Sequence, residues 1–108
     1  MYLRLVSAAL LLAMAAFADT WNGTIVDVMC RGKDLASHTS KCATMPNCAK
    51  SGFGVVLADG KFLKFDEIGN AMALKRLKAP SAKEKDLKAK VTGSLDGDVI
   101  KVESFEIQ

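Results

Sequence analysis

The stretch LKAKVTGSLDGDVIKVESFEI, residues 87–107, is the part of the chain that decides the fold. Leu87, Ala89 and Val91 alternate with polar residues, which is the pattern of a strand buried on one face. Asp96-Gly97 then gives a strong signal for a tight turn, and a second apolar run follows it. The stretch therefore predicts a β-hairpin that packs one side against a core.

The second strand of this hairpin changes the face that carries its apolar residues. Ile100 and Val102 share one parity, whereas Phe105 and Ile107 have the other. Because side chains alternate between the two faces of a strand, this strand needs a β-bulge near Ser104 or cover on both faces.

The rest of the chain adds three strands and one helix. The expected elements are strands at about 24–29, 53–58 and 62–65 and a helix at 71–78. Asp59-Gly60 is a hairpin turn signal, Asn70 is the expected N-cap of the helix, and Pro80 ends it. The helix residues expected on one apolar face are Ala71, Leu74 and Leu77. Five strands with one helix between the third and fourth predict a mainly β, OB-like barrel. Gly93 supports this prediction, because strands of a small barrel need a glycine or a bulge where they bend sharply. Four-stranded or open-sheet α+β arrangements are the alternatives.

An apolar run near the start of the chain predicts export. Residues 5–17 carry no charge, Arg4 precedes them, and Ala16-Phe17-Ala18 has small residues at both ends. These are the three regions of a secretory signal peptide, so we expect residues 1–18 to be removed. The run has 13 residues, whereas a membrane span needs about 20, so no span is expected after signal removal. Residues 19–108 are then a single OB-like domain that is secreted or periplasmic.

The charge of the chain bears on its partners. The sequence has 15 Lys and Arg against 12 Asp and Glu, a net charge of +3, which falls to +2 when Arg4 leaves. This balance does not favour the positive groove that single-stranded nucleic acid requires. We expect no nucleic-acid partner and a monomer that binds a small ligand or a protein.

A polar, cysteine-bearing segment at 31–52 follows the first strand. Asp34 is the expected cap of a short helix that runs to Lys41 or Cys42, and Pro46 is expected to stop it. The sequence therefore predicts a loop with a short helix at this point.

Three cysteines, Cys30, Cys42 and Cys48, lie in or next to this segment. In an oxidising compartment thiols tend to pair, and a small domain gains stability from a cross-link. We expect a disulfide of Cys30 with Cys42 or with Cys48, and spacing does not decide between them. An odd number of cysteines leaves one thiol over.

The same segment is a candidate metal site. His38 and Cys42 are four residues apart, so on a helix they would share a face. Three thiolates and one imidazole suit tetrahedral zinc or copper(I). The candidate ligands are Cys30, His38, Cys42 and Cys48.

Three neighbouring residues bear on this candidate site. Met29 and Met45 can add thioether ligands for copper. Asp27 stands in an apolar strand. It is either a hydrogen-bond acceptor that fixes the tautomer of a metal-bound His38, or an outward-facing residue on a strand with one buried face. We favour the outward-facing position, because a buried carboxylate is costly unless it is paired.

Enzymatic interpretations have less support. A thiol-redox role would use Lys41 and Lys50 to favour thiolates at Cys42 and Cys48. However, the sequence has no Cys-x-x-Cys pair. A Cys–His hydrolase would need orienting and oxyanion groups beside His38, and no such signature is present. We therefore expect no catalytic residue.

The order of these residues resembles a known group of proteins. Trp21, Gly23, Asp27 and Cys30 are followed by His38-x-x-x-Cys42, by Cys48-Ala-Lys-Ser-Gly, by a DGK turn at 59–61 and by VTGSLDGDVIKVES. This pattern looks like a group of small exported bacterial proteins of unknown function. The resemblance implies an OB-like barrel and export, and it brings no activity. Five residues separate Cys42 from Cys48, where similar sequences often have three.

Two functions follow as hypotheses. The first is an exported, non-enzymatic module whose cysteine and histidine loop binds a metal ion, zinc or copper, or another small ligand. The second is a disulfide-stapled structural or protein-interaction domain with no ligand.

Overall fold

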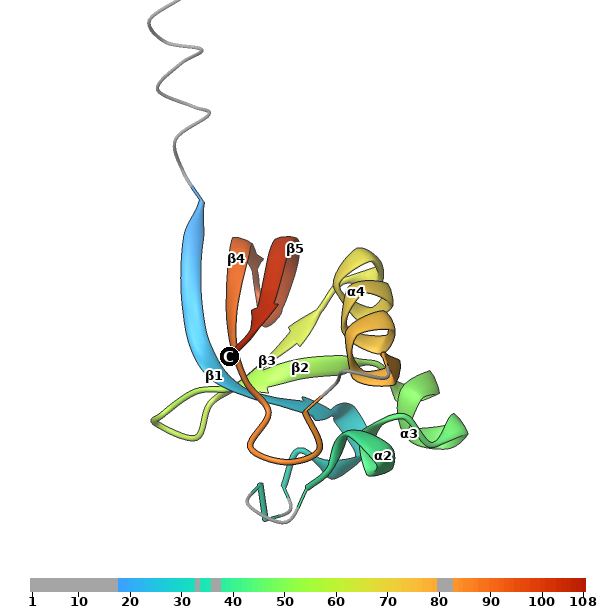
Figure 1. Cartoon of the computed structure of the whole chain (residues 1–108). Helices are drawn as coiled ribbons and strands as arrows, with labels where there is room; N and C mark the ends of the chain where they lie inside the picture. Colours follow the sequence, from blue (N-terminus) through green and yellow to red (C-terminus); the bar gives the residue numbers. More distant parts are fainter. Residues whose placement is uncertain (1–17, 33, 36–37, 80–82) are drawn as a thin grey trace, which may run out of the picture.

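A computed structural model describes residues 18–108 except 33, 36–37 and 80–82 (Figure 1). The predicted signal peptide therefore falls outside the described residues, apart from Ala18. The elements in chain order are β1 (Asp19–Asp27), the 3-10 helix η1 (Val28–Cys30), α2 (Ser40–Ala43), α3 (Pro46–Ser51), β2 (Phe53–Val56), β3 (Phe62–Phe65), α4 (Glu67–Lys78), β4 (Lys88–Asp96) and β5 (Val99–Ile107). The strands form a closed barrel in the order β1-β2-β3-β5-β4. This confirms the predicted five-stranded OB-like barrel with one helix, α4, between the third and fourth strands.

The first strand is longer than predicted because it serves two neighbours. Its first half, Asp19–Thr24, pairs with β4, and its second half, Thr24–Asp27, pairs with β2. The strand curves between the two, as Figure 1 shows. The prediction that it continues to Met29 was wrong, since the chain leaves the sheet after Asp27 and forms η1.

The predicted bulge is present in β5. Thr92 of β4 pairs with Ser104, whereas the next residue, Gly93, pairs with Val102. Glu103 is thus the extra residue, one position from the predicted Ser104. The shift turns both Val102 and Phe105 inward, which explains the change of parity in the sequence.

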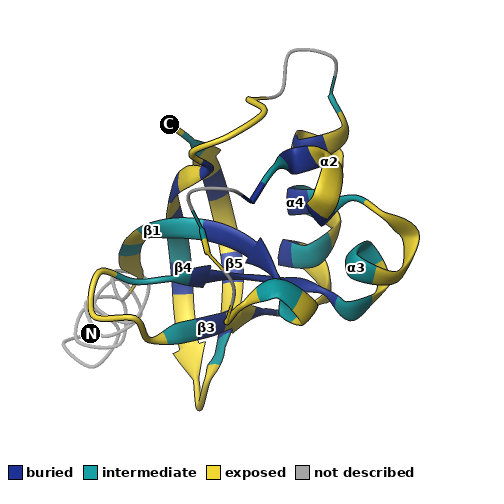
Figure 2. Cartoon of the chain, turned by 90° about the horizontal axis from the view of Figure 1, so that it is seen from below, coloured by how far each residue is buried: buried dark blue, intermediate teal, exposed yellow. Residues whose placement is uncertain are grey.

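The core fills the barrel and reaches α4. Phe65 and Phe105 meet edge to face with ring centroids 5.9 Å apart. Buried positions alternate with exposed ones along the strands (Figure 2). The other large buried residues are Ile25, Phe53, Val55, Leu63, Leu77, Leu87, Val91 and Ile100.

Helix α4 starts earlier than predicted, and its cap is Asp66 rather than Asn70. The Asp66 carboxylate accepts a hydrogen bond from the Gly69 N–H at 2.9 Å. Asn70 has another role, because its side-chain oxygen accepts from the Phe53 N–H at 2.8 Å. The earlier start changes the buried face of α4, which consists of Gly69, Ala73 and Leu77. Ala71, predicted to face inward, is therefore exposed.

Replacement of Asp66 by alanine tests this cap. Asp66→Ala is expected to lower the free energy of unfolding by about 1–2 kcal/mol, because the helix loses its N-cap acceptor. The carboxylate also accepts from the Val102 N–H at 3.3 Å, which ties α4 to β5. Urea unfolding measures the change, and Glu67→Ala, at the exposed next position, is the control with a loss below about 0.5 kcal/mol.

The cysteine-bearing segment also differs from its prediction in detail. Helix α2 begins at Ser40, where the Thr39 hydroxyl accepts from the Cys42 N–H at 3.1 Å, so Asp34 is not its cap. The predicted end of this helix is close, since α2 ends at Ala43, before Pro46. Pro46 also opens a second helix, α3, that was not predicted, since the first turn needs no N–H from that residue. No helix in the described part of the chain is long and apolar enough to cross a membrane.

Candidate metal centre

The candidate centre lies where β1 ends and α3 turns into β2. Asp27 is the last residue of β1 and pairs with Phe53. The next residue, Val28, donates its N–H to the carbonyl oxygen of Gly52 at 2.9 Å. Gly52 has a φ of 90°, which favours glycine, and it directs the chain from α3 into β2. These contacts hold η1 against α3, and with them Cys30 against Cys48.

Three potential ligand atoms converge at this point. A carboxylate oxygen of Asp27 and the sulfur atoms of Cys30 and Cys48 all lie within 4.8 Å of one another. Asp27 is fully buried, and both cysteines are half-buried. The three residues come from a strand end and two short helices, so the barrel fixes Asp27, η1 carries Cys30 and α3 carries Cys48.

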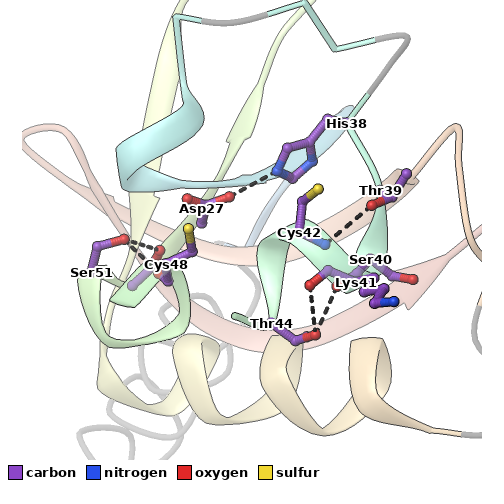
Figure 3. A network of polar contacts seen from close by, with 10 residues as sticks. Asp27, His38, Thr39, Ser40, Lys41, Cys42, Thr44, Cys48 and Ser51 are labelled. Atoms are coloured by element: carbon purple, nitrogen blue, oxygen red, sulfur yellow. Dashed lines mark hydrogen bonds and ion pairs between the residues drawn. The ribbon is translucent and has the colours of Figure 1, made fainter. Parts of the chain in front are cut away.

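His38 contacts this group through Asp27. Its Nε2 lies 2.8 Å from Asp27 Oδ1, and Figure 3 shows the Asp27 carboxylate between the His38 ring and the Cys48 sulfur. With Asp27 Oδ1 as acceptor, Nε2 carries the proton and donates it. The preferred prediction that Asp27 faces outward was wrong, because the chain folds its polar segment over the end of β1.

Two buried polar atoms at this pair have no hydrogen-bond partner among the described residues. They are Asp27 Oδ2 and His38 Nδ1. A buried carboxylate is costly when one of its oxygen atoms lacks a hydrogen-bond partner, because the group has lost most of its hydration. A cation at Oδ2 would offset that cost.

The surroundings of Cys48 disfavour its thiolate by raising the pKa of the thiol. Partial burial raises its pKa, and the negative charge of Asp27 raises it further. The prediction that Lys50 favours a thiolate at Cys48 is therefore not what the structure shows. A cation that binds here has to displace the Cys48 proton, as thiolate coordination always requires.

Cys42 does not belong to the converging group. It lies on α2 with its residue exposed, and His38 precedes that helix, so the two do not share a helix face as predicted. The expected disulfide is also absent, since no bond joins Cys30, Cys42 or Cys48 in the described part of the chain. Met29 and Met45, proposed as thioether ligands, are 60% and 56% exposed.

The contact between Asp27 and His38 is the one expected if Asp27 is a hydrogen-bond acceptor of His38. The structure differs from the predicted ligand set in that Asp27, rather than His38, lies next to the two sulfurs as a potential ligand. The signal was in the sequence, because Asp27 and Cys30 are three residues apart at the end of a strand. That spacing is uninformative without the 3-10 turn that folds Cys30 back beside the carboxylate.

Comparison of the chain with family models, with curated proteins and with solved structures finds no match. The chemistry of Asp27, Cys30 and Cys48 is therefore the basis on which a function can be assigned.

Proposed function

We propose that this protein binds one zinc ion through Asp27, Cys30 and Cys48. The observation that carries the proposal is the convergence of a carboxylate oxygen and two sulfur atoms within 4.8 Å. Zinc ligands lie about 2.0–2.3 Å from the ion, so neighbouring ligand atoms of one site are separated by about 3–4 Å. Small shifts of side-chain rotamers bring the three atoms to that spacing.

Charge supports the same proposal. The buried Asp27 carboxylate has one oxygen, Oδ2, that no described group satisfies. A divalent cation would neutralise the Asp27 carboxylate and stabilise the thiolates of Cys30 and Cys48. Without a cation, the carboxylate charge is buried with little to offset its cost.

The ligand set favours zinc over other metals. Two sulfurs argue against calcium and magnesium, which take oxygen ligands. A carboxylate ligand argues against copper(I), which prefers thiolates and thioethers, and both methionines point into solvent by their exposure. Zinc accepts sulfur and carboxylate in one tetrahedral site.

Three protein ligands leave the fourth zinc position for water or an external ligand. We propose that the site has a binding role. Export to a secreted or periplasmic location is part of the same proposal, on the basis of the apolar run at residues 5–17.

A zinc titration tests the proposal. Fully reduced protein should bind one equivalent of Zn²⁺ in competition with a chromophoric chelator. Thermal unfolding should shift upward, since a free zinc concentration of 100 Kd adds about 2.7 kcal/mol to the stability of the folded state. A titration in which the reduced protein takes no zinc from the chelator would sink the proposal.

His38 is expected to act as a positioning residue for this site. His38→Ala removes the donor to Asp27 Oδ1 and should weaken zinc binding about 10- to 100-fold, the usual effect of losing a hydrogen bond to a metal ligand. His38→Gln keeps a donor and should recover part of the affinity. Urea unfolding of the metal-free variants separates this effect from a general loss of stability. Equal zinc affinities for wild type and His38→Ala contradict the assigned role.

A further inference from the structure

The two sulfurs of the candidate centre can react with each other as well as bind zinc. Cys30 and Cys48 have their Sγ atoms within 4.8 Å of one another. Each lies on a short element, η1 of three residues and α3 of six, rather than in the sheet. A disulfide needs the two sulfurs about 2.0–2.1 Å apart, so these two short elements have to move closer together for a bond to form.

We propose that Cys30 and Cys48 form a reversible dithiol–disulfide pair that exchanges with external disulfides, and that the oxidised pair does not bind zinc. The second half of this statement rests on the proposed zinc site, whereas the first half stands without it. The substrate class is a small-molecule or protein disulfide that can reach two half-buried sulfurs.

The exchange is balanced in atoms and electrons. One thiolate of the pair attacks a sulfur of the incoming disulfide R–S–S–R, which forms a mixed disulfide and releases RS⁻. The other thiolate then attacks the protein sulfur of that mixed disulfide and releases the second RS⁻. The protein loses two electrons and gains one S–S bond, and the two protons of the cysteine thiols go to the two released thiolates.

Cys42 is the natural comparison within the chain. It is more exposed than Cys30 and Cys48, so it can form mixed disulfides with solution thiols. Its sulfur lies outside the converging group, however. The geometry therefore assigns the intramolecular bridge to Cys30 and Cys48 and leaves Cys42 as the third thiol.

Zinc should protect the pair from oxidation. Both thiolates donate electron density to the ion when zinc is bound, which lowers their nucleophilicity toward a disulfide. Zinc binding and disulfide formation then exclude each other at the same two sulfur atoms.

The experiment incubates reduced protein with glutathione disulfide, with and without one equivalent of Zn²⁺, and follows the intact mass. Cys42 and Cys48 lie in one tryptic peptide, 42–50, so fragment-ion spectra of the disulfide-linked peptides assign the bridged cysteine. The expected result is a loss of 2 Da, a Cys30–Cys48 bridge, and oxidation at least about tenfold slower with zinc. Cys42→Ser should form the same bridge at the same rate. Circular dichroism of the oxidised protein shows whether the barrel remains folded.

Three outcomes test the dithiol pair and its exclusion of zinc. A bridge that involves Cys42, or mixed disulfides alone, overturns the dithiol pair. A Cys30–Cys48 bridge that forms equally fast with zinc supports the pair and overturns its exclusion of zinc. If the chelator titration has also failed, the zinc site falls and the redox pair still stands.

Discussion

Replacement of Cys48 by serine is expected to weaken zinc binding by more than about 100-fold. This loss is larger than the one expected when a residue that only hydrogen-bonds to a zinc ligand is replaced. The serine hydroxyl is not ionised at neutral pH and is a poor zinc ligand, so the site would retain one sulfur and one carboxylate. Cys30→Ser should have the same effect. Competition with a chromophoric chelator measures both affinities on freshly reduced protein.

The matched control for these variants is Cys42→Ser. Cys42 is exposed and lies outside the group formed by Asp27, Cys30 and Cys48, so its replacement should change the zinc affinity by less than about threefold. If Cys42→Ser loses as much zinc affinity as Cys48→Ser, the assigned ligand set is wrong. That result would favour the site with three cysteines expected from the sequence.

Replacement of Gly93 by alanine is expected to lower the free energy of unfolding by about 3 kcal/mol or more. A Cβ atom at this position would overlap the carbonyl oxygen of Lys101 and stand 3.2 Å from the Cα of Val102. Both neighbours are backbone of β5 at the bulge, so neither can turn away. For a domain of this size the loss corresponds to a fall in Tm of at least about 12 °C.

Gly32→Ala is the control for this prediction. No atom of the described residues lies within 4 Å of the Cβ position at Gly32, so its replacement should change the stability by less than about 0.5 kcal/mol. Urea unfolding of both variants makes the comparison. If Gly93→Ala unfolds at the wild-type urea concentration, the close approach of β4 and β5 at the bulge is wrong.

The barrel was predictable because its signals are local. The alternation of Leu87, Ala89 and Val91 and the change of parity after Val102 each depend on neighbouring residues along one strand. The helix start was missed because Asp66 and Asn70 are both good N-caps, and the choice between them depends on contacts with β2 and β5. Such contacts join residues that are distant in sequence.

The candidate site was predictable only in its residue types. The sequence pointed to Cys30, His38, Cys42 and Cys48, and the structure brings Cys30 and Cys48 together with Asp27. The helical spacing of His38 and Cys42 was misleading, because Thr39 caps α2 and leaves His38 outside the helix. The turn at Gly52 places Cys48 near the end of β1. The spacing of apolar residues in the sequence does not predict this turn.

X-ray absorption at the zinc edge of the zinc-loaded, reduced protein tests the central claim most directly. The ligand set of Asp27, Cys30 and Cys48 predicts two sulfur neighbours at about 2.3 Å and oxygen neighbours at about 2.0–2.2 Å. A spectrum with no sulfur neighbour, or with three sulfurs and no oxygen, would contradict it.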